Sequence, residues 1–324
     1  MISAKEAQII INQSLNKINW DLSPLGLYVP IAYFLGEGGK RVRPVLGLLA
    51  ADLFDADYSS VINPMIGIEI FHNFSLLHDD LMDKAEMRRN KPTVHIKWDE
   101  NTALLSGDAM LVKSYQYIAQ APDYSLQEVF DIFSQTALEV CEGQQYDMDF
   151  EKLETVSANE YLEMIRLKTA VLLAASMKIA AIIGKASAED AQLLYDFGIN
   201  IGLAFQLKDD LLDVYGDSEI FGKKIGGDIL CNKKTFLLIK AREKASLEIK
   251  ERLDGWMYKG RFLPNEKITA ITAIYDELGV KELCEQKIDY YFDAAVRCLD
   301  KVSVDNSCKT VLRNFTEELM TRVS

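Results

Sequence analysis

Proline is scarce in this chain, with seven residues in 324, and long segments contain neither proline nor glycine. The alternation of apolar and polar residues that marks strands is nearly absent as well. Apolar residues instead recur with helical spacing, for example over Ile66–Met82, Leu126–Phe150 and Ala188–Tyr215. Proline and glycine interrupt helices, so their scarcity favours helices. Strands would show a period of two, which is missing, so the pattern predicts an all-α protein.

Paired cysteines are also lacking. The cysteines are scattered and odd in number, and no two form a CxxC pair; they are Cys141, Cys231, Cys284, Cys298 and Cys308. Neither a disulfide framework nor a zinc site is therefore indicated. A reducing cytoplasm is the expected location.

No apolar run is long enough for a membrane span. The most apolar stretch, Thr169–Gly184, is too short and contains Lys178, so we expect a buried core helix there. The first residues, Met1–Ile18, carry polar and acidic residues within their apolar run and have no small-residue cleavage site. They predict an amphipathic helix rather than a signal peptide.

Positive charge is in short supply. The chain has 36 Lys and Arg against 49 Asp and Glu, a formal net charge of −13. This balance argues against general binding of nucleic acid or of anionic membranes, but it leaves room for a local basic pocket. No Walker loop, Rossmann fingerprint in its proper context or Ser-His-Asp spacing is present.

What the chain does have is two aspartate clusters, Asp79–Asp83 and Asp209–Asp213, which both read DDxxD. Residues four apart share one face of a helix, so each cluster points at least two carboxylates the same way. Their repulsion costs stability unless a cation lies between them. Oxygen-only ligands suit Mg²⁺, which usually shares its coordination shell with substrate phosphates. Two such clusters facing each other would form a cage for a diphosphate.

Each cluster belongs to a polar stripe on an otherwise apolar helix. The stripe residues are His72, Ser75, Asp79 and Asp83 in the first helix and Gln206, Asp209 and Asp213 in the second. A single acidic pentapeptide is common on solvated helix faces. Two of them, each within an apolar helix and each followed by a basic loop, indicate a lined cavity instead.

Lysines and arginines gather beside these clusters. Gly38–Pro44 contains Lys40, Arg41 and Arg43 and precedes an apolar helix, whose N-terminus would attract anions. The other basic residues are Arg88, Arg89 and Lys91 after the first cluster, Lys168 beside Thr169, and Lys223, Lys224, Lys233 and Lys234 after the second. Alone, each group would be an ordinary solvated turn. Next to the carboxylates they indicate phosphate binding.

Together these residues resemble the polyprenyl synthetase (trans-isoprenyl diphosphate synthase) family. The motifs that carry the resemblance are GGKRVRP, HNFSLLHDDLMD, RRNKPTVH, LLSGDAML, EGQQYDMDF, RLKTA, FQLKDDLLDVYGD and GKKIGGDILCNKKT. They occur in the order typical of the family and cover nearly the whole chain. The resemblance implies the isoprenoid synthase fold, a single domain over residues 1–324 and a homodimer. The implied fold is a helical bundle around a central cavity.

The resemblance also implies an activity, the condensation of isopentenyl diphosphate with dimethylallyl, geranyl or farnesyl diphosphate. It implies about three Mg²⁺ ions per active site, with Mn²⁺ able to substitute, since hard cations offset the diphosphate charge. By position, the metal ligands are Asp79, Asp80, Asp83, Asp209, Asp210 and Asp213, the last two acting partly through bound water. The implied catalytic set is these aspartates with Lys168 and Lys223.

Two groups of substrate contacts follow from the same resemblance. The allylic diphosphate contacts are Arg88, Lys168, Thr169, Gln206, Lys223 and Lys233. The isopentenyl diphosphate contacts are Lys40, Arg43, His72, Arg89 and Phe205. Departure of the allylic diphosphate would leave a carbocation, which the double bond of isopentenyl diphosphate attacks in a cavity kept free of water.

Product length is expected to depend on residues below the first cluster. Ser75 and Phe74 precede Asp79 by roughly 6–7.5 Å along a helix, about one or two isoprene units. In the family, bulk at these positions closes the pocket floor, and Phe71 would lie deeper. We predict a C15 or C20 product. C20 is favoured because Ser75 leaves room and the first cluster lacks the two-residue insertion of many bacterial farnesyl diphosphate synthases.

Two other functions share parts of this pattern. A class I terpene cyclase would also use a DDxxD cluster and Mg²⁺, but it needs no isopentenyl diphosphate site, which GGKRVRP, His72 and Arg89 predict. A catalytic or regulatory subunit of a longer-chain or heteromeric prenyl synthase is the second alternative. Regulatory subunits commonly lose aspartates, and both clusters are intact here.

Overall fold

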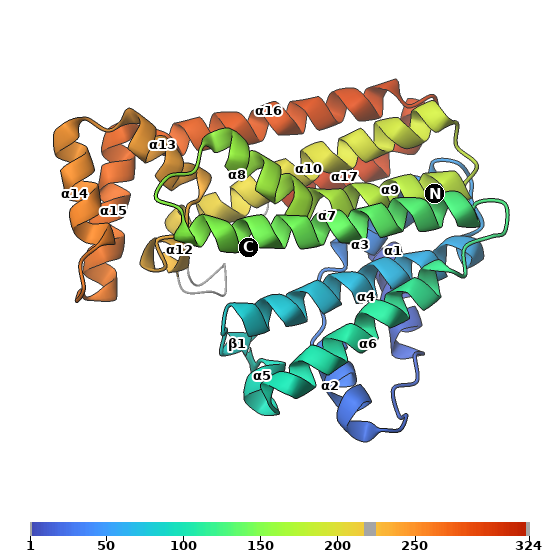
Figure 1. Cartoon of the computed structure of the whole chain (residues 1–324). Coiled ribbons are helices and arrows are strands. Elements are labelled where there is room, and N and C mark those ends of the chain that lie inside the picture. The colour runs from blue at the N-terminus through green and yellow to red at the C-terminus, as the bar shows by residue number, and fades with distance from the viewer. Residues whose placement is uncertain (1, 217–224, 322–324) are drawn as a thin grey trace. The chain divides into compact units, whose positions relative to one another are not determined.

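A computed structural model of the chain describes residues 2–216 and 225–321 (Figure 1). Helices dominate the described residues, and the strands there form one two-stranded antiparallel ladder, β1 (Met87–Arg88) with β2 (Lys91–Pro92). The prediction of an all-α fold is therefore confirmed. The α-helices as far as the first aspartate cluster are α1 (Ala4–Asn16), α2 (Leu25–Leu35), α3 (Val42–Asp52) and α4 (Tyr58–Met82).

Helices continue to the end of the described chain. They are α5 (Val94–Lys97), α6 (Glu100–Ile118), α7 (Leu126–Lys152), α8 (Ala158–Ile165), the π-helix η1 (Arg166–Ala170), α9 (Val171–Ile183), α10 (Ala188–Tyr215), α12 (Gly227–Leu230), α13 (Phe236–Lys244), α14 (Leu247–Met257), α15 (Pro264–Leu278), α16 (Val280–Lys301) and α17 (Asn306–Thr321). Gly279, the C-cap residue of α15, separates α15 from α16, and a short segment around Ser303 separates α16 from α17.

Two compact units make up the chain. Unit 1 comprises Met1–Thr136, Ala175–Tyr195 and Lys301–Leu312; unit 2 comprises Ala137–Ala174, Asp196–Asp300 and Arg313–Ser324. The boundaries between the units fall inside α7, α9, α10, α16 and α17. The single domain over residues 1–324 stays a prediction.

In unit 1, α4 contacts α1, α2, α3, α5 and α6. The helix begins at Tyr58, because the carboxylate of Asp57 accepts a hydrogen bond from the Ser59 amide at 3.0 Å and so caps its first turn. This start lies eight residues before Ile66, where the apolar periodicity first becomes clear in the sequence. The helix then continues through Pro64. Pro64 and its neighbours Met65 and Ile66 are buried, and this packing outweighs the hydrogen bond that a proline removes.

In unit 2, a hydrophobic core joins α8, α10, α13, α15 and α16 through buried residues such as Tyr161, Leu207, Leu237, Ile274 and Cys284. Between α13 and α14 the chain turns at Ala245, whose ψ of 132° is extended. The Ser246 hydroxyl then accepts a hydrogen bond from the Ile249 amide at 3.3 Å and starts α14.

Two further expectations concern the cysteines and the apolar stretch. All five cysteines lie in the described part of the chain and are free thiols. Within Thr169–Gly184, the side chains from Ala170 to Met177 are buried, so the prediction of a core helix is confirmed. Along the described residues, no helix combines the length and the apolar character that crossing a membrane requires.

Candidate active site

The first aspartate cluster lies at the C-terminal end of α4, in unit 1. Asp83 is the C-cap residue, and its amide donates to the Asp79 carbonyl at 2.8 Å. A helix C-terminus carries partial negative charge, which adds to the repulsion between these carboxylates and increases their need for a cation. Asp80 differs from the other two, because it is buried and accepts a hydrogen bond from Arg88 Nε at 2.7 Å. Burial raises the pKa of Asp80, and the Arg88 guanidinium partly opposes that rise.

The predicted isopentenyl diphosphate contacts of unit 1 gather around one turn. His72 Nε2 lies 3.1 Å from Arg43 Nη1. Burial lowers the pKa of His72 well below its usual value, and the positive charges of Arg43 and Arg89 lower it further. Because a guanidinium can only donate, Nε2 of His72 is the acceptor of the hydrogen bond from Arg43. A guanidinium nitrogen of Arg89 donates to the Gly38 carbonyl on the same turn.

Gly39 explains why this turn is built from glycines. Its φ is 148°, and a Cβ there would lie 3.2 Å from Arg89 Nη2. A side chain would therefore crowd the guanidinium that closes over the turn. Lys40, the next residue, is exposed. Because its side chain is already exposed, its ammonium can bind a ligand without leaving a buried environment.

Arg41 is a residue whose importance the sequence did not reveal. It has the left-handed conformation, with φ of 52°, and is buried. Its guanidinium binds Glu69 Oε1 at 2.7 Å and donates to the Leu35 carbonyl at 3.0 Å. The amide of Asn73 also donates to Glu69, at 3.0 Å. This network fixes the turn that carries Lys40 and Arg43; its signal in the sequence was the lone acidic residue Glu69 within an apolar run.

In unit 2, Lys168 and Thr169 lie on the π-helix η1, a rare local geometry that often occurs at functional sites. A Cβ on Gly143 of α7 would lie 2.3 Å from the Lys168 backbone nitrogen, so only glycine lets α7 approach this closely. One turn further along α7, Asp147 Oδ2 lies 2.7 Å from Lys168 Nζ and 4.0 Å from Lys233 Nζ. Burial would raise the pKa of Asp147, but the charges of Lys233 and Lys168 outweigh it and lower that pKa.

Asp147 therefore holds two of the predicted allylic diphosphate contacts together. Sequence reasoning missed it, although it lies within the EGQQYDMDF motif. Asp147 and Lys168 are 21 residues apart in the sequence, so no local pattern predicts that they pair. Lys223, predicted as a further contact and as a catalytic residue, lies outside the described residues.

A chain of hydrogen bonds ends on Asp210 of the second cluster. Thr169 Oγ1 donates to Gln206 Oε1 at 3.1 Å, and Gln206 Nε2 donates to Asp210 Oδ1 at 3.1 Å. The buried hydroxyl of Tyr161 donates to the other oxygen of Asp210. Burial, with a contribution from the charge of Asp228, raises the pKa of Asp210 to about 7. Asp210 thus anchors the cluster within unit 2, while Asp209 is only partly buried.

The remaining residues of the second cluster have distinct surroundings. Asp213 Oδ2 accepts from the Asp228 amide at 3.0 Å, and the Asp213 carbonyl accepts from Gly226 at 2.6 Å. Asp213 therefore holds the segment that leads to Lys233. Phe205 lies on α10 next to Gln206 and is partly buried.

The predicted chain-length residues form an aromatic group in unit 1. The ring centroids of Phe74 and Phe71 are 5.4 Å apart, as are those of Phe71 and Phe133. Phe74 also stacks edge-on with His78 at 4.7 Å. Ser75, whose hydroxyl donates to the His72 carbonyl at 2.9 Å, is small and only partly buried.

The aspartates of the two clusters offer the oxygen ligands that Mg²⁺ prefers. In the parts of the chain that the structure describes, no three His, Cys, Asp or Glu side chains converge as a ready-made metal site. Mg²⁺ does not need such a cage, because it keeps several waters and takes one or two carboxylates together with substrate phosphates. Carboxylates four residues apart on one helix, at least partly exposed, fit this requirement.

Within unit 1, the structure thus brings together Arg43 with His72, Arg89 with the glycine turn, and Asp80 with Arg88. Within unit 2, it brings together Lys168 with Lys233, and Thr169 with Gln206 and Asp210. Carboxylates that suit Mg²⁺, accompanied in each unit by lysines or arginines, fit the binding of a diphosphate through metal ions.

The comparisons with known proteins give the family. The family model described as polyprenyl synthetase matches residues 26–277, and the chain belongs to this family. It is 36% identical to a geranylgeranyl diphosphate synthase of Methanosarcina mazei, over 92% of this chain and 90% of that protein. It is 38% identical to a geranylfarnesyl diphosphate synthase of Natronomonas pharaonis, over 74% of this chain and 75% of that one.

A crystal structure of a geranylgeranyl pyrophosphate synthase matches with a TM-score of 0.95 and 40% identity, over 100% of both chains. The predicted isoprenoid synthase fold is thereby confirmed. The prediction of a metal-dependent prenyltransferase that makes prenyl diphosphates is confirmed too.

Replacing Tyr161 with phenylalanine should lower the free energy of unfolding by about 1–3 kcal/mol, because a buried oxygen of Asp210 would lose its donor. Equilibrium urea unfolding measures this change. Tyr290→Phe, which removes an exposed hydroxyl, is the control and should change stability by less than about 0.5 kcal/mol. Equal stability of the two variants would contradict an anchoring role for Tyr161.

Proposed function

We propose that this prenyltransferase condenses isopentenyl diphosphate with an allylic diphosphate to give an all-trans C20 diphosphate. The observation that carries the proposal is the pair of DDxxD clusters on apolar helices, each accompanied by its own lysines and arginines. The names of its relatives support the product class, since they include geranylgeranyl and geranylfarnesyl diphosphate synthases. The primer is dimethylallyl, geranyl or farnesyl diphosphate.

The protein's own residues divide the work between two substrates. Arg88, Lys168, Thr169, Gln206 and Lys233 bind the allylic diphosphate, and Lys223 is proposed with them. Cations there stabilise the negative charge that develops on the leaving diphosphate, so no protein nucleophile is needed. Lys40, Arg43, His72, Arg89 and Phe205 bind and orient isopentenyl diphosphate for attack on the allylic carbon.

A neutral His72 suits this second role. It can donate from Nδ1 to a diphosphate oxygen while Nε2 accepts from Arg43, so the arginine keeps a fixed direction. The metal ligands that we propose are the six aspartates of the two clusters, with the last two acting partly through bound water: Asp79, Asp80, Asp83, Asp209, Asp210 and Asp213. Bound Mg²⁺, about three ions with Mn²⁺ as a substitute, would polarise the leaving diphosphate.

One assay tests this function against its alternatives. Purified protein is mixed with Mg²⁺, labelled isopentenyl diphosphate and an allylic primer. Chain elongation is the expected result. Release of diphosphate with a cyclic hydrocarbon, and no need for isopentenyl diphosphate, would identify a terpene cyclase instead. Activity that requires an added partner would identify a subunit of a heteromeric synthase.

Replacing Phe74 with alanine should lengthen the product by about one isoprene unit, because the ring nearest the first cluster would no longer limit the pocket. Chromatography of the dephosphorylated products measures this. Adding Phe71→Ala should lengthen the product again, since Phe71 lies beyond Phe74 and is fully buried. If Phe74→Ala made the parent's product, Phe74 would not be the floor.

We also propose a cytoplasmic homodimer. Free thiols support the location. Exposed apolar side chains support the dimer, because Leu105 and Val112 are each 59% exposed and lie two turns apart on α6. Light scattering after gel filtration tests it, and Leu105→Lys should then give a monomer.

A further inference from the structure

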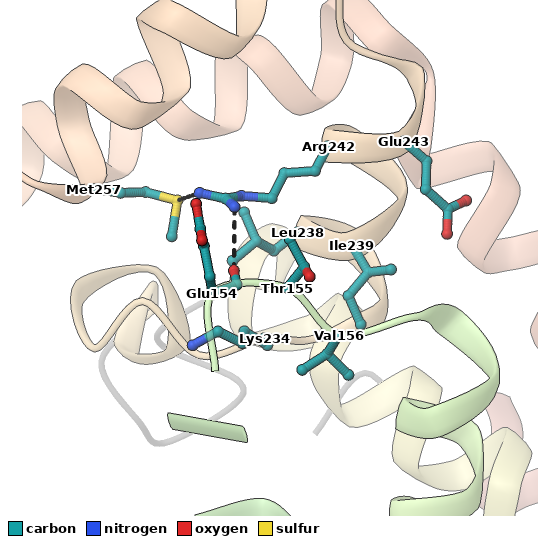
Figure 2. A pocket seen from close by; sticks show the side chains of 9 residues that line it. All are labelled: Glu154, Thr155, Val156, Lys234, Leu238, Ile239, Arg242, Glu243 and Met257. Atoms are coloured by element: carbon teal, nitrogen blue, oxygen red, sulfur yellow. Dashed lines mark hydrogen bonds between the residues drawn. The ribbon is translucent and has the colours of Figure 1, made fainter. Parts of the chain in front are cut away.

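A pocket of about 200 Å³ lies in unit 2, apart from the residues assigned above (Figure 2). Its lining comes from three segments: the loop after α7, the stretch from Lys234 into α13, and the end of α14. The lining residues are Glu154, Thr155, Val156, Lys234, Leu238, Ile239, Arg242, Glu243 and Met257. It is smaller than the 300–1,000 Å³ pockets of drug-sized ligands, which suits a molecule on the order of ten non-hydrogen atoms.

The polar side of the pocket offers donors in excess of acceptors. Arg242 donates to Asp254 at 2.7 Å and to the Glu154 carbonyl at 3.4 Å, but its Nε is buried and has no hydrogen-bond partner among the described residues. Lys234 Nζ donates to the Glu151 carbonyl at 3.3 Å, which leaves donor capacity on its ammonium. Burial lowers the pKa of Lys234, and the positive charge of Arg242 lowers it further.

The opposite character marks the rest of the lining. Val156, Leu238 and Ile239 are buried apolar side chains, and Met257 adds a flexible thioether. A ligand that satisfies both parts must carry an anionic, acceptor-rich head and a short apolar tail. A purely polar ion would leave the apolar wall unused, and a hydrocarbon would leave the donors unsatisfied.

The two acidic residues of the lining, Glu154 and Glu243, differ in how far they offset the positive charge of Lys234 and Arg242. Glu243 is paired with Lys240 at 2.6 Å, and in Figure 2 it points away from the Arg242 guanidinium. Glu154 is exposed at the rim and would repel an anion. Glu154 therefore limits affinity, which gives the pocket a testable property.

We propose that this pocket is a second ligand site, for a small phosphate monoester that carries a short apolar tail. The site is linked to the allylic contacts through adjacent residues: Lys234 lines the pocket, while Lys233 lies 4.0 Å from Asp147. A phosphate that draws Lys234 toward Arg242 would also move Lys233. The pocket is thus placed to adjust the allylic contacts according to the supply of short phosphorylated substrates.

The experiment uses 3-methylbutyl monophosphate as the probe, with the full-length protein and without Mg²⁺, and measures binding by isothermal titration calorimetry. We expect Lys234→Met and Thr155→Trp each to weaken binding by on the order of ten-fold or more, the first by removing a charged donor and the second by filling the pocket from an exposed position. Glu154→Gln should tighten it. Lys244→Met removes an exposed charge at the end of α13, outside the lining of the pocket, and should leave the affinity unchanged.

A Lys40→Met variant separates this site from the proposed isopentenyl diphosphate site. It should retain the binding that Lys234→Met removes. Three results would each overturn the proposal. They are no binding of the probe to the parent, loss of all binding in Lys40→Met, and an affinity in Lys234→Met and Thr155→Trp equal to that of the parent. Chain elongation by the parent is measured separately, so failure of the second site is distinguishable from failure of the proposed function.

Discussion

Replacing Asp79 with asparagine should lower kcat for chain elongation by on the order of 10³-fold or more, since it removes a charge that the leaving diphosphate requires through bound cations. Asparagine keeps the size of the side chain, so the end of α4 should keep its structure. The hydrogen bond that ends this helix uses the Asp79 carbonyl, which the substitution does not touch. Steady-state kinetics with labelled isopentenyl diphosphate, together with the Mg²⁺ concentration that gives half-maximal rate, measure the effect.

Asp131→Asn is the matched control. Asp131 is an exposed aspartate of α7 whose carboxylate accepts from Gln127 at 2.9 Å. It removes one negative charge elsewhere in unit 1 and should leave kcat within about two-fold of the parent. A fall of less than ten-fold in Asp79→Asn would show that the first cluster does not carry the metal-dependent step.

The parts of the site that follow from local spacing were predictable. Carboxylates four residues apart share a helix face whatever the rest of the fold does, so Asp79 with Asp83 and Asp209 with Asp213 could be predicted from the sequence. The helices themselves follow from apolar periodicity. The exception is Pro64, where α4 continues because burial of this proline and its neighbours outweighs its low helix propensity.

The parts that depend on distant segments were not predictable. Tyr161 and Asp210 are 49 residues apart, and Lys168 and Asp147 are 21 apart. The π-helix under Lys168 is a backbone geometry that no side-chain pattern specifies. Each of these features orients a predicted site residue. The chemistry of the site could therefore be predicted from the sequence, but the contacts that hold its side chains in place could not.

Replacing Arg41 with methionine should lower the free energy of unfolding by about 3–5 kcal/mol, because the buried carboxylate of Glu69 would lose its charged partner. Both side chains are at most 4% exposed. Arg41 binds Glu69 Oε1, and Glu69 Oε2 has no hydrogen-bond partner in the described part of the chain. Equilibrium urea unfolding measures the loss. Arg252→Met breaks a pair with Glu277 that is 46% and 45% exposed, and it should cost at most about 1 kcal/mol.

The double variant Arg41→Met with Glu69→Leu separates stability from function. It removes both buried charges and should recover most of the stability. It should not recover the turn, because the guanidinium that donates to the Leu35 carbonyl and to Asn12 is still absent. Lys40 and Arg43 flank that position, so KM for isopentenyl diphosphate should stay raised by about ten-fold or more while stability returns. A KM that recovers together with stability would mean that Arg41 supports the fold alone and has no part in positioning the two cations.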